Sequence, residues 1–313
     1  MVGPALVGLA GRARAGWRGR AGPGVVGPGV VGPGVVGPGV VGPGVVGPGV
    51  VGPGVVGVVG SVVAVGLGCP FVLVLLPPSE TKASGGDGPP LSFEALSLPE
   101  LNPVRAKLVD ALVDLAGDVP ASLAVLGLSE RQAGEVARNA VLRTSPTLPA
   151  LSRYTGVLYD ALDLPTLTRV ERGRAAERLG VASALFGVVL GADPIPAYRL
   201  SGGNVLPSVG PLGSLWRPVL TPALAEREVI DLRSAPYSSL ARIPHAITVK
   251  VVTEDGTGRR QAVSHFNKAH KGLLARAIVR SRAVPRAGNL VKIAANAGLR
   301  LEPAGERHFE LVV

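Results

Sequence analysis

Seven tandem copies of the pentapeptide GPGVV, from Gly22 to Val56, exclude most of the first seventy residues from any packed core. Each Pro-Gly pair supplies the fixed φ and the positive φ of a type II turn, and no segment between pairs is long enough to bury a face. We therefore divide the chain into a disordered, low-complexity extension, residues 1–70, and a folded domain, residues 71–313.

Two interpretations of the repeat remain open. It is either an extensible, self-associating arm or a translated segment upstream of the true start, which a Val codon near Val72 would provide in a bacterial gene. The second interpretation is favoured, because a segment of this composition forms no packed core and the sequence after it contains no similar repeat. Temperature-dependent self-association that disappears when the repeats are deleted would identify the first.

The charge of the domain is basic but moderate. Four of the ten net positive charges come from arginines of the extension, so six remain for residues 71–313. Such an excess permits nucleic acid or another polyanion as partner without requiring one, because a solvated Arg-rich surface explains it equally well.

Cysteine usage and hydropathy indicate the compartment. Cys69 is the only cysteine, so no disulfide framework exists and a cytoplasmic location fits best. The uncharged stretch Val55–Leu76 reaches the roughly 20 residues that a membrane span needs. Two features argue against a membrane span: glycines recur throughout the stretch, and Pro70 interrupts it. Its last six residues also fit the first strand of the domain better, so we expect no membrane association.

The stretch FVLVLLPPSETK, residues 71–82, predicts the centre of the domain. Its apolar run, Phe71–Leu76, reads as a buried strand, and Pro77-Pro78 ends that strand. Ser79, Glu80 and Lys82 then follow together in a polar loop. We expect a functional site at this strand end.

Two helices are marked by their first residues. Asn102 and Pro103 predict a helix that continues through apolar residues at helical spacing to Gly117. Ser129 and Gln132 form an S-x-x-Q capping box before a second helix, whose outer side carries Arg131, Arg138 and Arg143.

The turn between these helical stretches, Leu126–Ser129, is similar to the hairpin of helix-hairpin-helix DNA binders. In those proteins a Gly-containing turn and the first N–H groups of the next helix hold a phosphate. An ordinary helix connection has the same sequence, and is the simpler interpretation.

The remaining chain predicts a mixed α/β (α+β) fold in which helices flank a mixed sheet. Val181–Leu190 reads as a central strand with a turn at Gly187, and a strand runs through Leu200. Residues 229–232, 247–253, 260–264, 299–301 and 309–312 predict further strands. A long helix from Phe266 to Arg282 places Phe266, Leu273, Leu274 and Ala277 on an apolar face, and Lys268, Lys271 and Arg282 on a basic face.

Five segments in order resemble the family of the peroxide stress protein YaaA, and they span essentially the whole of residues 71–313. They are LLPPSETK, YTGVLYDAL, LFGVVLGADPIPAYRL, VIDLRSAPYSSL and VSHFNKAHKGLLARAIV. The resemblance implies a single compact α/β domain of unusual topology. It also implies a role in surviving hydrogen peroxide and in limiting iron-driven damage, with double-stranded DNA bound in a basic cleft that contains a helix-hairpin-helix element.

The resemblance and the basic helices together define candidate sites. The candidates for anion or DNA contact are Lys82, Arg131, Arg138, Arg199, Lys268, Lys271 and Arg276, and the candidates for the cleft are Ser79, Tyr154, Tyr198 and Tyr237. Family members more often carry Arg before Gly272. Lys271 therefore predicts a point-charge contact rather than a bidentate grip on phosphate.

The residues also bear on enzymatic chemistry and on metal binding. Ser79, Lys82 and Lys268 allow an enzyme with a Ser or Lys nucleophile, since a lysine near another cation or partly buried has a lowered pKa. Phosphate contacts or simple ion pairs are the plainer roles for both lysines. The four histidines, with no cysteine in the domain, match no common metal spacing, so we expect no metal and no cofactor.

Overall fold

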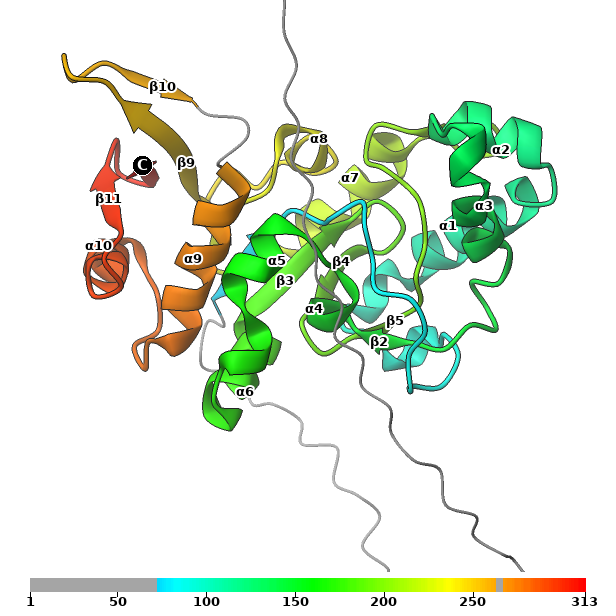
Figure 1. The fold of residues 1–313 in the computed structure, drawn as a ribbon, viewed down its shortest axis with the longest axis horizontal. Helices are drawn as coiled ribbons and strands as arrows, with labels where there is room; N and C mark the ends of the chain where they lie inside the picture. The colour runs from blue at the N-terminus through cyan, green and yellow to red at the C-terminus, as the bar shows by residue number, and fades with distance from the viewer. Residues whose placement is uncertain (1–71, 263–266) are drawn as a thin grey trace, which may run out of the picture. The chain divides into compact units, whose positions relative to one another are not determined.

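The computed structural model describes residues 72–262 and 267–313. The GPGVV repeats, and with them the predicted disordered extension, lie outside the described residues. Within the described part, an eight-stranded mixed sheet is flanked by helices (Figure 1), which confirms the predicted α/β class.

The sheet has the strand order β11-β12-β9-β8-β1-β3-β4, and β10 pairs with β9. Strand β1 runs parallel to β3 and β8, and β9 runs parallel to β8 and β12. Strands β4, β10 and β11 pair antiparallel with β3, β9 and β12. The strands are β1 Leu73–Leu76, β3 Leu179–Ser183, β4 Gly187–Leu190, β8 Val229–Asp231, β9 Ile247–Glu254, β10 Arg260–Ala262, β11 Arg300–Pro303 and β12 His308–Val312.

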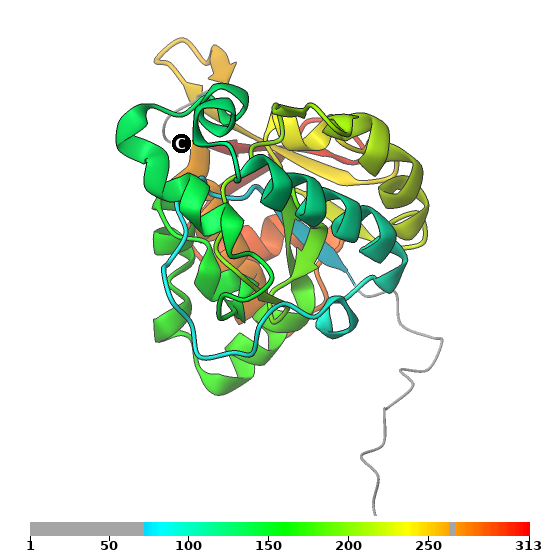
Figure 2. The same ribbon diagram turned by 90° about the vertical axis from the view of Figure 1, so that its right-hand side faces the viewer.

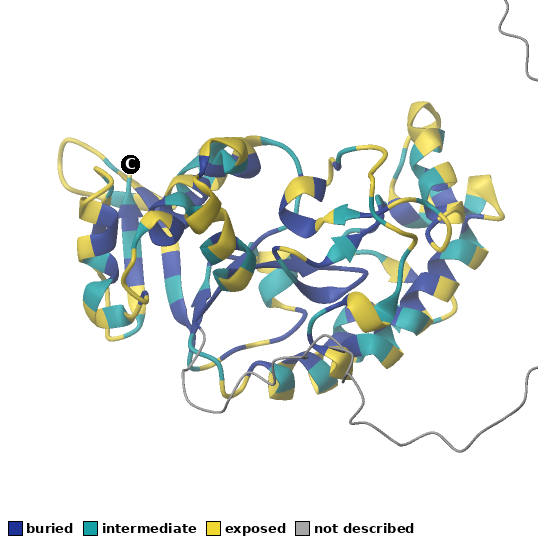
Figure 3. Ribbon diagram, turned by 90° about the horizontal axis from the view of Figure 1, so that it is seen from below, coloured by how far each residue is buried: buried dark blue, intermediate teal, exposed yellow. Residues whose placement is uncertain are grey.

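The central place of β1 accounts for its sequence. All four of its residues are buried, as in a parallel strand that is covered on both faces, and this favours a continuous apolar run over alternation. Figure 3 shows the strands mostly in the colour of buried residues. The predicted strand at residues 71–76 is thus confirmed from Leu73 onward.

The helices form two groups. Helices α5 and α6 each pack on α9, and α6 contacts β1, β3 and β4 while α9 contacts β9. Helices α1, α2 and α3 pack against one another (Figure 2), and α7 packs on β4. The helices are α1 Asn102–Leu115, α2 Val119–Leu126, α3 Ala133–Ala140, α4 Ala150–Arg153, α5 Val157–Leu162, α6 Arg169–Arg178, α7 Leu212–Ala223, α8 Ala235–Ser238, α9 Asn267–Arg280 and α10 Ala287–Ala295.

Both predicted helix starts are confirmed. Helix α1 begins at Asn102 with Pro103 in its first turn. Ser129 and Gln132 form the expected capping box, at the start of a 3₁₀ turn, Glu130–Gln132, that runs into α3. Two short antiparallel pairs complete the described fold: β2 Leu148–Pro149 with β5 Pro194–Ile195, and β6 Val205–Leu206 with β7 Gly210–Pro211.

One of two strand predictions in this region is confirmed in outline, and the other was wrong. Within residues 181–190 the end of β3 is followed by a turn and by β4, which begins at Gly187 with φ 73°, as expected for a strand with a turn at that glycine. A Cβ at Gly187 would lie 2.7 Å from the Trp216 ring, so the tight hairpin is built around that side chain. No strand runs through Leu200 in the described structure, because the backbone of Arg199 pairs with the side-chain amide of Asn139 at 2.8 and 2.9 Å.

The predicted faces of α9 also need correction. Lys271 is buried, with 6% of its surface exposed, whereas Leu273 is 38% exposed. Gly272 faces α5, since a Cβ there would lie 2.2 Å from the carbonyl oxygen of Leu158. This close helix contact turns Lys271 inward and Leu273 outward. Phe266 lies outside the described residues.

Candidate functional site

The carboxyl end of β1 lies at the point where the strand order of the sheet reverses, because later strands are added on both sides of β1. The chain passes from β1 to β3 on one side, whereas β8 on the other side of β1 leads on to β9. In open α/β sheets, loops that leave such neighbouring strands border a crevice in which ligands bind. Here the loop 77–82 follows β1 and the residues around Arg233 follow β8.

Hydrogen bonds hold the loop after β1 in place. The Tyr159 hydroxyl donates to the Pro77 carbonyl oxygen at 2.9 Å, and Lys82 forms an antiparallel bridge with Tyr154. The Ser79 and Thr81 hydroxyl oxygens lie 3.0 Å apart, and the Thr155 hydroxyl donates to that of Thr81 at 3.1 Å. The loop therefore presents several hydroxyl groups in a defined arrangement.

Lys82 lies beneath this loop and not on its surface. Its amine donates to the carbonyl oxygens of Ser79 at 3.1 Å and Glu80 at 3.4 Å. The amine also lies 4.1 Å from the ring centroid of Tyr198 and 5.3 Å from that of Tyr154. Burial, reinforced by the positive charge of Arg199, lowers the pKa of Lys82 to about 7.

The three tyrosines expected in the cleft differ in burial: two are fully buried and one is half-buried. Tyr154 and Tyr198 are 2% and 1% exposed, so they support the site from below and do not line an open cleft. Their hydroxyl groups lie 2.8 Å apart, and the Tyr198 hydroxyl lies 2.7 Å from that of Ser183. Burial raises the pKa of both tyrosines. Tyr237 is half-buried, and its hydroxyl accepts from the Gly202 N–H at 3.3 Å.

Two predicted cations, Arg199 and Arg138, lie near Lys82. Arg199 pairs with Glu80 at 2.6 Å, and Arg138 pairs with Glu135 at 2.8 Å while it donates to the Ser84 hydroxyl. Both arginines lower the pKa of Lys82 by their charge, which places them in one electrostatic cluster with it. The structure thus brings together residues that are far apart in the sequence.

The remaining predicted cations divide into two kinds. Arg276 donates to the carbonyl oxygens of Leu162 and Asp163, both at 2.8 Å, and so caps the end of α5. Lys271 donates to the Arg233 carbonyl oxygen at 3.2 Å, and burial lowers its pKa to about 8. Arg131 and Lys268 are exposed, and neither forms an ion pair with the residues that the structure describes.

A cavity of about 320 Å³, hereafter the β1 cavity, opens at the loop after β1. It is lined by residues 77–81, residues 155–159 and Lys268. Ser79 and Lys268, two residues singled out in the sequence, therefore share one cavity. Lys82 is absent from its wall, and its amine contacts the carbonyl oxygen of Ser79, not the hydroxyl. Thr81, Thr155 and Tyr159 were missed, because no spacing rule marks isolated hydroxyl groups.

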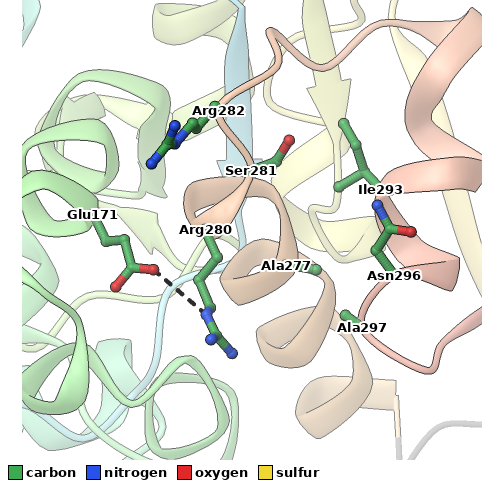
Figure 4. Close-up of a pocket in the computed structure, with 8 residues that line it drawn as sticks. All are labelled: Glu171, Ala277, Arg280, Ser281, Arg282, Ile293, Asn296 and Ala297. Atoms are coloured by element: carbon green, nitrogen blue, oxygen red, sulfur yellow. Dashed lines mark ion pairs between the residues drawn. The ribbon is translucent and has the colours of Figure 1, made fainter.

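A second cavity, of about 410 Å³, lies at the opposite end of α9 and is lined by residues of α6, α9 and α10 (Figure 4). Arg280 reaches from α9 toward Glu171, with 3.5 Å between the charged atoms. The carbonyl groups at this helix end accept from Arg174 and Arg178. The cavity is thus bordered by a helix terminus whose acceptors are already occupied.

Comparison with known proteins decides the family. The family described as "Peroxide stress protein YaaA" matches residues 72–304. The chain belongs to the YaaA family. The family assignment made from the five sequence segments is confirmed, and the matched range contains the β1 cavity together with all the candidate site residues.

Relatives match the chain over most of their own length. The UPF0246 protein of Corynebacterium efficiens is 47% identical over 238 residues, which are 74% of this chain and 95% of the relative. That of Corynebacterium glutamicum is 46% identical over 251 residues, 77% and 100%. That of Streptomyces coelicolor is 43% identical over 239 residues, 74% and 92%. Among the described residues of this YaaA-family chain, no helix is both long and apolar enough to cross a membrane.

Proposed function

We propose that this YaaA-family protein acts in the response to peroxide stress by binding double-stranded DNA. In this proposal it limits iron-driven oxidative damage by covering the DNA. The surface that binds is the helical hairpin of residues 118–140, which includes Arg138, together with Arg199, whose backbone pairs with Asn139 of the hairpin. Lys82 lies buried behind this surface and does not itself contact DNA.

The conformation of the turn between α2 and α3 carries the proposal. Helix α2 ends at Gly127 in the left-handed conformation, with φ 64°, and the Leu128 N–H returns to the Leu123 carbonyl oxygen at 2.8 Å. The capping box at Ser129 then starts the next helical stretch. A compact turn of this kind between two helices supports a helix-hairpin-helix contact with phosphate. The Gln132 N–H is bonded to Ser129, so the N–H groups of Glu130 and Arg131 are the ones that would face a phosphate oxygen.

Charge near the hairpin supports the same function. Arg131 is exposed in the first turn after the hairpin, where a cation can contact the same phosphate group. Arg138 projects from α3 toward Ser84 on the loop that leads from the β1 cavity. Acidic groups are also present. Glu135 and Glu80 are each paired with an arginine, whereas Asp118 and Glu130 are exposed and form no ion pair with the residues that the structure describes, so the hairpin depends on its arginines and N–H groups and not on its net charge.

Fluorescence anisotropy of the full chain with a labelled duplex tests the proposal. We expect binding that weakens steeply between about 50 and 200 mM salt, with a similar affinity for duplexes of different sequence. Arg131→Ala should weaken binding to all duplexes alike and reduce the salt slope by about 1. Arg169→Ala, which removes an exposed arginine from α6, is the matched control and should leave binding unchanged.

Two results would reject this function. One is the absence of salt-dependent binding in the unaltered chain. The other is an equal effect of Arg131→Ala and Arg169→Ala, because binding would then depend on net charge and not on the hairpin.

The alternative is an enzyme that uses Ser79, Lys82 or Lys268. A serine nucleophile needs a base within hydrogen-bond distance of its hydroxyl. In the described structure the Lys82 amine contacts backbone carbonyl oxygens, so this geometry favours a supporting role for Lys82. DNA binding is therefore the better supported function.

A further inference from the structure

We propose that the β1 cavity is a second, separate site, which binds the phosphate group of a small phosphorylated compound. The cavity lies at the carboxyl end of a central parallel strand, beside the point where the strand order changes direction. Its volume of about 320 Å³ lies at the lower end of the roughly 300–1,000 Å³ typical of small-molecule sites.

Three hydroxyl groups supply the donors. Ser79 and Thr81 belong to the loop after β1, and Thr155 precedes Gly156. The Thr81 hydroxyl oxygen lies 3.0 Å from that of Ser79 and 3.1 Å from that of Thr155. Either hydroxyl of the Ser79–Thr81 pair can donate to the other, and Thr81 has a second acceptor in the Thr155 carbonyl oxygen at 3.5 Å. All of these hydroxyl groups are exposed and can rotate. Both protons can therefore turn to a phosphate oxygen without leaving a buried group unpaired.

The charges around the cavity favour an anion. Lys268 contributes the one exposed cation among the described wall residues. Glu80 is the acidic residue of that wall, and its carboxylate is paired with Arg199 at 2.6 Å. Behind the wall, the Lys82 amine donates to the carbonyl oxygens of Ser79 and Glu80 and so fixes the backbone of the loop that carries the Ser79 hydroxyl.

The backbone leaves room for the ligand beside the hydroxyl groups. Gly156 has φ 97°, a conformation that residues with a side chain rarely adopt. A Cβ at this position would lie 3.4 Å from the Ser79 hydroxyl oxygen and 3.5 Å from that of Thr81. A side chain here would therefore occupy the space in which the hydroxyl groups meet a ligand.

Isothermal titration of the full chain with inorganic phosphate and with ribose 5-phosphate tests the site. We expect both compounds to bind, the ester more tightly because it also fills the cavity. Lys268→Ala and Ser79→Ala should each weaken binding about tenfold, the effect of losing one charge-assisted hydrogen bond. Lys250→Ala removes an exposed lysine from β9 and should change nothing.

A competition experiment with duplex DNA distinguishes this site from the proposed DNA-binding surface. Arg131→Ala should leave phosphate binding intact, and saturating duplex should not displace ribose 5-phosphate. Displacement by duplex would show that the cavity receives the phosphate of the DNA backbone, and would overturn a separate site. Failure of both small compounds to bind, or equal binding by Lys268→Ala and Lys250→Ala, would overturn it as well. Neither of these failures bears on DNA binding through the hairpin.

Discussion

The buried amine of Lys82 should make the stability of the fold depend on pH. Its pKa in the folded chain is about 7, against an ordinary value of 10.5. Between these values the unfolded chain binds one more proton than the folded chain, so the free energy of unfolding increases with pH. One proton corresponds to about 1.4 kcal/mol per pH unit, so the whole interval amounts to about 5 kcal/mol.

Replacement by Lys82→Met removes this titration while it keeps an apolar chain of similar length between the tyrosines. From about pH 7.5 to about pH 9.5 the unaltered protein should gain about 3 kcal/mol relative to the variant. Urea unfolding of both proteins at several pH values measures the difference. Lys271, whose pKa is lowered to about 8, contributes equally to both proteins and cancels.

An exposed lysine of α1 provides the control. Lys107→Met should leave the slope of stability against pH as it is in the unaltered protein. If Lys82→Met also leaves that slope unchanged, the amine is charged in the folded protein throughout the interval. The argument from burial would then be wrong.

Four further substitutions test the packing and the ion pairs. Gly272→Ala forces a Cβ to within 2.2 Å of the Leu158 carbonyl oxygen and should cost about 1–3 kcal/mol. Gly134→Ala, on a helix with open space around it, should instead stabilise by about 0.5–1 kcal/mol; calorimetry that ranks the two the other way would refute the close helix contact. Arg105→Met leaves four acceptors in the structure without their donor and should cost about 3 kcal/mol in chemical denaturation, so a loss near zero would contradict it. Arg260→Ala separates three carboxylates from their shared partner, and the melting temperature should fall more in low salt than in high salt.

Elements that rest on local chemistry were predictable. The apolar run before Pro77-Pro78 is a strand because it is buried on both faces, and the two prolines end its hydrogen bonding. Pro103 in the first turn of α1 suits a helix start because its fixed φ is helical and its missing N–H is not needed there. The box of Ser129 and Gln132 satisfies the first N–H groups of the next helical stretch within a few residues. These signals need no knowledge of distant parts of the chain.

The orientation of α9 was not predictable in this way. Helical periodicity tells which residues share a face, and it groups Lys271 with Leu274 and Ile278 as readily as with Lys268. The choice between these faces is made by α5, whose backbone approaches so closely that only Gly272 fits at the contact. Lys271 is then carried inward, where its amine reaches the Arg233 carbonyl oxygen.

The sequence by itself determined the family and the sheet-and-helix class, and it predicted a candidate site in the loop after β1. Only the tertiary structure decided where each candidate residue lies. Lys82, chosen as a possible nucleophile, lies under the loop against Tyr154 and Tyr198, whereas Ser79 and Lys268 meet in the β1 cavity. The physical reason is that burial and pairing depend on which distant segments pack together, and that packing is set by the whole chain and not by the residues near each motif.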